Sequence, residues 1–582
     1  MERLRVNMGK VAQWTTAWMG AGTCIAFLLP NHYSPWVSFH HEAAVGLAFV
    51  PLLVCASFWS LKTGPVPAMT WVGMALAIVP FVQLLLGQLY FAGDAWVSAL
   101  YLLGFAFSVL AGACCTGQAR ETDGSHALAW LAPLWAAVIL ASIVSIGMAG
   151  HQWLMLEKLY VLVVEMPPDG RPFANLAQPN HLATLLLLGL AGLSFYWESG
   201  RLSAPTAFLA ALFLVAGLVA TQSRSVMLML AWLIPFYGML HRRCGLRTTW
   251  QALALLVAAY LGGAVAWPSI NEGLLLASRA DGTIDRLAQP GIRTVIWRAL
   301  ADGVMQAPWA GFGWGQISLA HSAIAMNYPG LQATYDSSHN LFLDIALWSG
   351  LPVAILTALA LLWWFTRQLA ECRDPLSWTT LFAIGAVFSH AMVEYPLSYA
   401  YFLLPTGLLM GALSAGQPVH RSHSWSRVHT WSRRSMPLLG AATAALFTVV
   451  MVEYLPYEDD WRLAQFQKAR VGDLRPSPPP GTMVLTNLRE ALWLVKAHAR
   501  PAMPFAEIQA VRKVAERYAS PSFVYHYALV QALNDQRDGA QLALQKLCKA
   551  VSAAACAAAE RDWLHLGDTA HPQLKHVRFP LP

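Results

Sequence analysis

Charge is what this sequence has least of: only 12% of its 582 residues are Asp, Glu, Lys or Arg, about half the fraction found in ordinary soluble proteins. Hydrophobic residues make up 57%, and apolar runs of about 20 residues recur through most of the chain. The composition therefore excludes a soluble globular enzyme and predicts a polytopic membrane protein. The formal net charge of +7 does not indicate nucleic-acid binding, because most of the cations lie in short loops, where they orient helices relative to a membrane.

The sequence also lacks the motifs of several enzyme classes. It has no Gly-rich loop followed by Lys, which excludes a Walker-type nucleotide site. Six of the eight cysteines lie in or beside apolar segments without metal-type spacing, and the histidines are too scattered for a zinc site. We therefore predict no metal and no cofactor. What remains is chemistry on a phosphate-bearing substrate, with arginines as electrophilic stabilisers.

Thirteen apolar segments predict membrane helices, so we expect an all-α polytopic fold. The first segment follows a short basic N-terminus and has no small-residue cleavage site, so it is expected to stay as a membrane helix. With the N-terminus in the cytoplasm, the cytoplasmic segments hold most of the Lys and Arg, which supports that orientation. The expected helices are 14–29, 43–60, 70–89, 97–116, 128–149, 181–197, 205–221, 225–240, 250–267, 340–365, 377–394, 398–415 and 436–454.

Two loops on the outer side are long, about 150–180 and 268–339. A loop of some seventy residues in a compact membrane domain is usually functional. An odd number of helices places residues 455–582 on the same outer side, and their charged composition indicates a soluble domain. Apolar positions at helix period predict that this domain is all-α, built from helix pairs like a tetratricopeptide array, although no clean 34-residue period is present. The expected domains are thus 1–454 and 455–582.

Two cysteines lie in this outer domain, where an oxidising compartment would permit a disulfide. On one straight helix the eight residues between Cys548 and Cys556 would separate them by about 12 Å, too far to bridge. The Ala-rich stretch 551–559 does not suggest the turn that a bond would require. Pairing is left open, with free thiols favoured.

Two outer arginines are candidates for binding an anion. Arg224, in Thr-Gln-Ser-Arg-Ser, lies at a membrane boundary among small polar residues, and its rigid fork suits phosphate oxygens. The alternative is snorkelling to lipid phosphate. Arg293 lies in an expected amphipathic helix of the long outer loop and shares a face with Trp297, four residues on. The alternative for Arg293 is an interfacial helix with cationic edges, and Arg298 falls on a different face.

His339 is the candidate base. It follows Ser337 and Ser338, which can cap the helix expected to begin near Asn340. A histidine with near-neutral pKa at the outer surface suits proton abstraction from a hydroxyl, whereas the plain alternative is a hydrogen-bonded structural imidazole.

Further polar residues lie at membrane-helix ends. His390 precedes Glu394 by four residues, and ionisable groups at that depth are functional hypotheses; a structural hydrogen bond between these two on one helix face is the competing account. His181 opens a helix on the outer face. Its neighbours Gln178 and Asn180 could bind sugar hydroxyls or cap that helix.

Six segments carry a family resemblance by their order and spacing around the long outer loop. The chain resembles the O-antigen ligase and polymerase (Wzy-C) superfamily, and within it the bacterial O-linked protein oligosaccharyltransferases of the PglL type. The region after 455 resembles the C-terminal region of the protein-modifying branch. The matching segments are Gln-Pro-Asn-His-Leu-Ala at 178–183, Thr-Gln-Ser-Arg-Ser at 221–225, Gly-Ile-Arg at 291–293, Pro-Trp-Ala-Gly-Phe-Gly-Trp-Gly-Gln at 308–316, Ser-His-Asn-Leu-Phe-Leu-Asp at 338–344 and His-Ala-Met-Val-Glu-Tyr-Pro at 390–396.

The resemblance implies a GT-C-like ligase fold in the bacterial inner membrane, with the outer domain in the periplasm. It implies metal-independent, inverting transfer of an oligosaccharide from undecaprenyl diphosphate to a Ser or Thr of a protein such as a pilin. His339 would activate the acceptor hydroxyl, and Arg224 and Arg293 would hold the diphosphate. Substrate-binding residues would be Gln178, Asn180, His181, Gln316, Asn340, His390, Glu394 and Tyr395.

Several other functions remain open at this point. An O-antigen ligase would use the same donor with lipid A–core sugar as acceptor, and the outer domain favours a protein acceptor over this ligase. A polymerase that joins glycan repeats is a third member of the same class. A transporter or flippase would also have many helices, but no paired internal repeats are evident and the candidate residues lie on one side. A scaffold with a docking domain is the least specific alternative.

Overall fold

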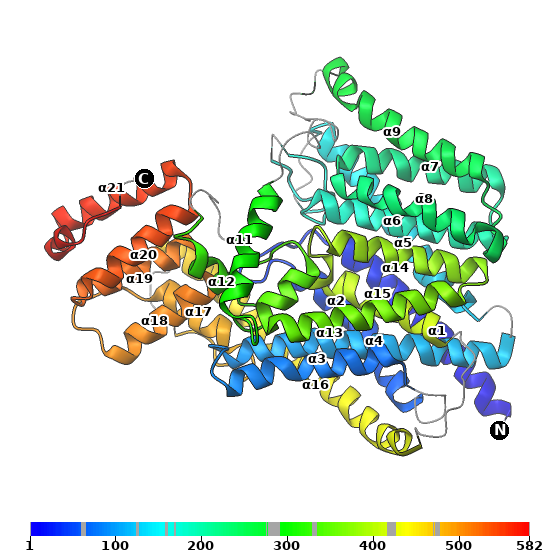
Figure 1. The fold of residues 1–582 in the computed structure, drawn as a ribbon, viewed down its shortest axis with the longest axis horizontal. Helices are drawn as coiled ribbons and strands as arrows, with labels where there is room; N and C mark the ends of the chain where they lie inside the picture. Colours follow the sequence, from blue (N-terminus) through cyan, green and yellow to red (C-terminus); the bar gives the residue numbers. More distant parts are fainter. Residues whose placement is uncertain are drawn as a thin grey trace. The chain divides into compact units, whose positions relative to one another are not determined.

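Helices dominate the computed structural model, which describes residues 2–59, 66–123, 127–156, 161–167, 170–274, 276, 292–328, 335–415, 426–469, 471 and 478–580. These described residues include no strand (Figure 1). Each of the thirteen expected membrane segments is helical, which confirms the predicted all-α, multi-pass fold. They are α1 (Glu2–Leu28), α2 (Phe39–Trp59), α3 (Ala68–Leu85), α4 (Ala92–Asp123), α5 (Ala132–Trp153), α6 (Pro179–Glu198), α7 (Ala204–Thr221), α8 (Arg224–Cys244), α9 (Trp250–Gly273), α13 (Leu341–Glu371), α14 (Pro375–Ala391), α15 (Ala400–Ala415) and α16 (Ser426–Lys468).

Nine helices in the described part of the chain are long and apolar enough to cross a membrane. The expected helices outside this group are α1, α8, α14 and α15. Two of these are short, since α14 has 17 residues and α15 has 16, against the roughly 20 that a straight span needs.

The chain folds as two compact units, each with its own interior. Unit 1 comprises residues 1–75, 101–290 and 360–447, and unit 2 comprises 76–100, 291–359 and 448–582. The second unit therefore combines the ends of several long helices, most of the long outer loop and the C-terminal region.

In unit 1 the central helix is α6, whose apolar residues are buried along almost its whole length. It packs against α5, α7, α8 and α14, and the axes of these helices lie roughly parallel in Figure 1. Such all-round burial requires apolar residues on every face, and α6 supplies them in its run of leucines at 185–188. The first turn of α6, which carries Asn180 and His181, is therefore held firmly.

In unit 2 the amphipathic helix predicted in the outer loop is confirmed as α11 (Ile292–Gln306), and α12 (Ile317–Ile324) follows it. The segment 308–316 joins them and lies along a break in α13. Phe312 N–H donates to Leu347 O at 2.7 Å, and Leu351 N–H donates to Pro308 O at 2.7 Å. The break therefore leaves carbonyl and amide groups of α13 without partners in the helix, and the backbone of segment 308–316 hydrogen-bonds to them. This close approach of two backbones explains why the segment is rich in glycine.

Gly350 forms this break, with φ of +80° and ψ of 169° inside α13. That region of backbone space is open almost only to glycine, and a Cβ would lie 2.4 Å from the carbonyl carbon of Trp309. We expect Gly350→Ala to destabilise the fold by about 2–4 kcal/mol, from backbone strain and the forced shift of the neighbouring loop. Thermal unfolding of the purified protein measures this. Gly303→Ala is the matched control, because the Cβ at Gly303 meets its nearest atom at 3.5 Å; an equal loss in both variants would contradict the prediction.

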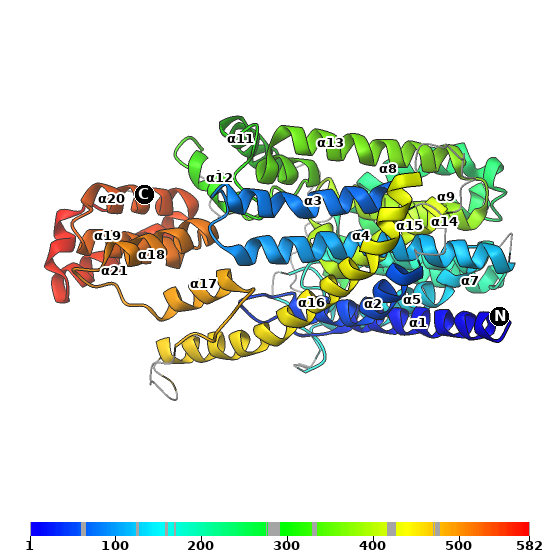
Figure 2. The ribbon, with the colours of Figure 1, turned by 90° about the horizontal axis from the view of Figure 1, so that it is seen from below.

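The C-terminal region of unit 2 is helical, as predicted, and consists of α17 (Thr486–Lys496), α18 (Phe505–Tyr518), α19 (Pro521–Leu533), α20 (Arg537–Ala550) and α21 (Ala553–Thr569). It follows α16, which continues without a break through the domain boundary expected at 454 and 455. Figure 2 shows α18, α19 and α20 stacked beside one another. Arg517 of α18 makes two hydrogen bonds to the buried Asp94 carboxylate, of 2.9 and 3.0 Å. Since both groups are largely buried and paired, this ion pair fixes α18 to the start of α4.

Cys548 and Cys556 form a disulfide, with Cα atoms 5.0 Å apart. The expectation of one straight helix through both residues was wrong, because α20 ends at Ala550 and α21 starts at Ala553. Ser552 makes the turn possible: its hydroxyl accepts the N–H of Ala555 and caps α21. A serine at that position was the sequence signal for the turn that the Ala-rich composition hid.

Replacing both cysteines by serine is expected to lower stability by about 2–3 kcal/mol, because the bond closes a short loop and restricts the unfolded chain. The measurement is the unfolding midpoint of the full chain with and without reducing agent. The wild type should lose stability on reduction and the double variant should not respond. Identical midpoints for reduced and oxidised wild type would contradict this.

Candidate functional site

His339 lies in a tight turn just before α13, in unit 2. Its φ is +57°, and its N–H donates to Ser337 Oγ at 3.0 Å. Ser337 and Ser338 were predicted to cap this helix, which was wrong. Asn340 caps α13, since its Oδ1 accepts the N–H groups of Phe342 and Leu343 at 3.1 Å each. The left-handed turn at His339 displaces Ser337 and Ser338 from the cap position. Asn340, expected to bind substrate, therefore has a structural task in this turn.

The carboxylate of Asp344, one turn into α13, organises the same turn. It is buried and accepts the N–H of Ser338 at 2.6 Å and the hydroxyl of Ser337 at 2.8 Å. A carboxylate that accepts two hydrogen bonds at one place orders the backbone strongly. Sequence reasoning missed Asp344, although the segment Ser338–Asp344 contained it.

Trp297 of α11 reaches the turn from outside, and its Nε1–H donates to Ser338 O at 2.8 Å. Arg293 lies one helical turn before Trp297 on the same face, so it faces the turn as well. Burial and the nearby Arg293 guanidinium lower the pKa of His339 to about 4, while Asp336 opposes the shift. Arg293 thus lies close enough to His339 to act on it electrostatically, and the imidazole is neutral at pH 7.

Gln316 lies elsewhere in unit 2 and is fully buried. Its Nε2 donates to Phe312 O at 2.7 Å and Gln88 O at 2.9 Å, while its Oε1 accepts the N–H of Tyr90 at 3.4 Å. The amide is therefore occupied by backbone groups. This arrangement gives Gln316 a structural role in place of the substrate contact expected from the resemblance.

A second polar cluster lies in unit 1 around the buried carboxylate of Glu394. Asn180 Nδ2 donates to Glu394 Oε1 at 2.8 Å, and Gln178 Nε2 donates to Oε2 at 3.2 Å. Asn180 Oδ1 in turn accepts the hydroxyl of Ser223 at 2.7 Å. Residues from the start of α6, the α7–α8 turn and the segment after α14 thus form one network.

Arg224 follows Ser223 directly and is the first residue of α8. The turn before it has Gln222 at φ of +48°, which allows α8 to reverse direction immediately after α7. Arg171, from the outer loop, donates to Gln222 O at 3.0 Å and to Thr221 O at 3.3 Å. Arg171 therefore supports the turn that positions Arg224, a role that the sequence did not indicate.

His181 and His390 complete this cluster, with ring centroids 5.8 Å apart. His390 Nδ1 lies 2.6 Å from the hydroxyl of Thr184. The expected helix to 394 was wrong in its end, because α14 ends at Ala391, although the N–H of Glu394 still donates to His390 O at 2.8 Å. Among the described residues, neither imidazole nitrogen of His181 has a hydrogen-bond partner, although the ring is buried.

The structure thus brings six predicted substrate residues together in unit 1: Gln178, Asn180, His181, His390, Glu394 and Tyr395, whose ring centroid is 6.2 Å from that of His181. It joins Arg293 and His339 in unit 2. The meeting of Arg224 with those two residues stays a prediction. In the described ranges no cluster of His, Cys, Asp and Glu could hold a metal ion.

Comparison with known proteins covers most of the chain. Residues 209–358 match the family model of O-Antigen ligase, residues 172–197 that of Protein glycosylation ligase, and residues 378–563 that of Virulence factor membrane-bound polymerase, C-terminal. The chain is 27% identical over 525 residues to a General O-oligosaccharyltransferase of Acinetobacter baylyi, which covers 89% of each protein. It is also 27% identical over 418 residues to a ComP-specific O-oligosaccharyltransferase of that organism, covering 71% of this chain and 72% of the relative.

The family matches include the segments that carry the candidate residues. Arg224, Arg293 and His339 all fall inside the O-antigen ligase match, and Gln178, Asn180 and His181 fall inside the protein glycosylation ligase match. The predicted resemblance to O-antigen ligases and to protein O-glycosylation ligases is therefore confirmed, and with it the enzyme class: this multi-pass membrane protein is a glycosyltransferase.

Proposed function

We propose that the protein transfers an oligosaccharide en bloc from undecaprenyl diphosphate to a Ser or Thr hydroxyl of a periplasmic, pilin-like protein. The observation that carries this proposal is the turn that holds His339, which Asp344 and Trp297 order, with Arg293 on the same face of α11 as Trp297. A base next to a phosphate-binding cation is what attack of a hydroxyl on a diphosphate-linked sugar requires. Similarity to two proteins named O-oligosaccharyltransferases supports it.

The reaction we propose is a single displacement that inverts the anomeric carbon and uses no metal. The acceptor oxygen forms a bond to the anomeric carbon while the bond from that carbon to the diphosphate oxygen breaks. The hydroxyl proton passes to His339, and the diphosphate leaves with its charge stabilised by Arg293 and Arg224. Diphosphate is a good leaving group, so positioning, charge neutralisation and one modest base suffice.

The donor would also strengthen the base. Because the positive charge of Arg293 contributes to the low pKa of His339, a bound diphosphate that neutralises this charge raises the affinity of the imidazole for a proton. His339 would therefore become a stronger base once the donor is in place. In the free enzyme it stays neutral and ready to accept a proton.

The unit 1 cluster suits a sugar-binding role. The amides of Gln178 and Asn180 already donate to the Glu394 carboxylate, so these bonds hold the polar side chains in fixed positions. Among the described residues Gln178 Oε1 has no hydrogen-bond partner. We propose that sugar hydroxyls near the diphosphate bind here.

We further propose that the N-terminus is cytoplasmic, that residues 1–454 form the inner-membrane enzyme domain and that residues 455–582 form a periplasmic domain. That domain would present the acceptor protein. The buried Arg517–Asp94 ion pair supports a fixed role for α18, since a domain tied in this way holds a bound acceptor steadily.

Intact-mass analysis of a candidate pilin tests the proposal. Cells with a lipid-linked glycan pathway should yield pilin heavier by one whole oligosaccharide when the protein is present, and unmodified pilin when it is absent. The match to the O-antigen ligase model favours a second candidate, transfer to lipid A–core sugar. Glycan on lipopolysaccharide, with none on any protein, would establish that second function and reject the first.

A further inference from the structure

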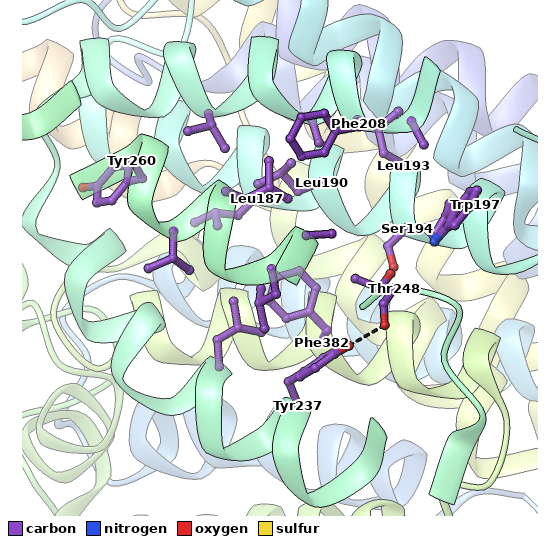
Figure 3. A pocket seen from close by; sticks show the side chains of 18 of the residues that line it. Leu187, Leu190, Leu193, Ser194, Trp197, Phe208, Tyr237, Thr248, Tyr260 and Phe382 are labelled. Carbon is purple, nitrogen blue, oxygen red and sulfur yellow. Dashed lines mark hydrogen bonds between the residues drawn. The ribbon is translucent and has the colours of Figure 1, made fainter. Parts of the chain in front are cut away.

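Unit 1 contains an apolar cavity of about 540 Å³ between α6, α7, α8, α9 and α14 (Figure 3). The side chains that line it include Leu187, Leu190, Phe208, Tyr260 and Phe382. The lining of α6 begins at Leu187, beyond the first turns that carry Asn180 and His181. The cavity is therefore separate from the polar cluster around Glu394.

Three of the surrounding helices, α6, α7 and α9, are long and apolar enough to span a membrane. Water does not fill such a space stably, because each buried molecule needs two to four polar partners. The apolar walls at Leu187, Leu190 and Phe208 provide few of these. A hydrocarbon chain from the surrounding bilayer is the available occupant, and the volume lies in the range of ligand pockets, about 300–1,000 Å³.

One end of the cavity is polar and cationic. Thr248, Thr249 and Arg247 line it, and the Arg247 guanidinium lies 4.3 Å from the centre of the Trp197 ring. One Arg247 N–H donates to Trp197 O at 2.8 Å, and because the side chain is exposed, a phosphate can reach the other donors of the fork.

The Glu198 carboxylate, next to Arg247 at this end, is already occupied. Glu198 is buried, and its oxygens accept the N–H groups of Arg247 and Thr248 at 2.6 and 3.0 Å and the Thr248 hydroxyl at 2.6 Å. Arg201 and Arg242, near the same helix ends, are exposed. Asp374, at the start of α14, is also exposed, but its oxygens accept the N–H and hydroxyl of Ser377 at 2.9 and 2.6 Å. The remaining accessible charge, from the three arginines, is positive and suits an anionic headgroup.

We propose that this cavity binds one anionic glycerophospholipid, with an acyl chain between α6, α7, α8 and α9 and its phosphate at Arg247. The end of the cavity at which the headgroup binds distinguishes this lipid from the glycan donor. Arg224 begins α8 and Arg247 follows its end, and a helix of 21 residues is about 30 Å long. A lipid whose phosphate binds Arg247 thus lies in the leaflet opposite to a diphosphate bound at Arg224.

The consequence of binding is structural. The cavity separates α7 and α9 from α8 and α14, so an acyl chain supplies the packing contacts that these helices do not make with each other. The protein should therefore be more stable with an anionic phospholipid than without one. This consequence does not depend on the glycosyl-transfer reaction.

Lipid analysis of the purified full chain tests the proposal. We expect wild-type protein in nanodiscs of mixed phosphatidylcholine and phosphatidylglycerol to retain phosphatidylglycerol in native mass spectra, and to unfold at higher temperature than in phosphatidylcholine alone. Ala211→Trp fills the cavity and should lower the retained lipid by about tenfold or more. Leu209→Trp, on the lipid-facing side of the same helix and 66% exposed, is the matched control and should retain it.

Arg247→Gln tests the headgroup contact and should lower the preference for phosphatidylglycerol over phosphatidylcholine by about tenfold. If Ala211→Trp does not reach the membrane, Ala207→Leu on the same wall is measured in its place. Unchanged lipid retention in the filled variant would overturn the proposal. So would equal retention of both phospholipids by the wild type, or a retained molecule that proves to be a polyprenyl phosphate.

Discussion

His339→Ala is expected to lower glycan transfer by about 10²–10⁴-fold, the range that one positioned general base contributes. The expectation rests on the geometry of unit 2, where the turn at His339 is held by Asp344 and Trp297 and the imidazole lies beside Arg293. Alanine removes the proton acceptor while the turn keeps its backbone partners. The measurement is the rate of acceptor glycosylation with donor in excess, alongside the amounts of protein and of exported donor, which should not change.

The matched control for this experiment is His576→Ala, which removes an exposed imidazole from the C-terminal region of the same unit. It should transfer glycan at the wild-type rate. If His339→Ala also transferred at the wild-type rate, the central assignment of the site would be lost. A loss of protein from the membrane in His339→Ala alone would instead assign the residue a structural task, the alternative recognised from the sequence.

The architecture could be predicted from the sequence because each membrane helix is encoded by a long apolar run. All thirteen expected segments are helical, and the amphipathic helix with Arg293 and Trp297 on one face is α11. Helix ends were less predictable. α14 stops at Ala391, three residues before its expected end at 394, whereas α13 starts at Leu341, one residue from its expected start. The left-handed turn at His339 was not predicted, because the same residues could also have capped the helix directly.

The candidate site likewise contains residues that could be predicted from the sequence and residues that could not. Residue types with strong chemistry at unusual places, such as His339, Arg293 and Glu394, could be selected from the sequence alone. The residues that support them could not, since Asp344, Arg171 and Thr184 are ordinary polar residues until the fold places them against a turn or a ring. Gln316 shows the opposite case: its motif marked it as a substrate residue, whereas its amide binds three backbone groups.

Arg293→Gln is expected to lower kcat/KM for the lipid-linked donor by about 10²–10³-fold, as for removal of one donor that stabilises developing charge. Arg298→Gln is the matched control. It removes the same charge from the same helix, but Arg298 is exposed and falls on a different face, so its activity should stay within about twofold of the wild type. Equal losses in the two variants would mean that activity depends on the total charge of α11, for example through attraction to lipid, and not on the position of Arg293.

The pH dependence of the Arg293 variant distinguishes a catalytic charge from a structural one. His339 accepts a proton only when neutral, so activity falls as the pH drops through its pKa, which is about 4 in the free protein. Burial is the main cause of that low value and the positive charge of Arg293 the next, so removing the charge raises the pKa and moves the acid limb of kcat/KM to higher pH. This parameter reports groups of the free enzyme. An acid limb at the same pH in Arg293→Gln and wild type, even with a slower rate, would separate Arg293 from His339 and leave it as a residue of the fold alone.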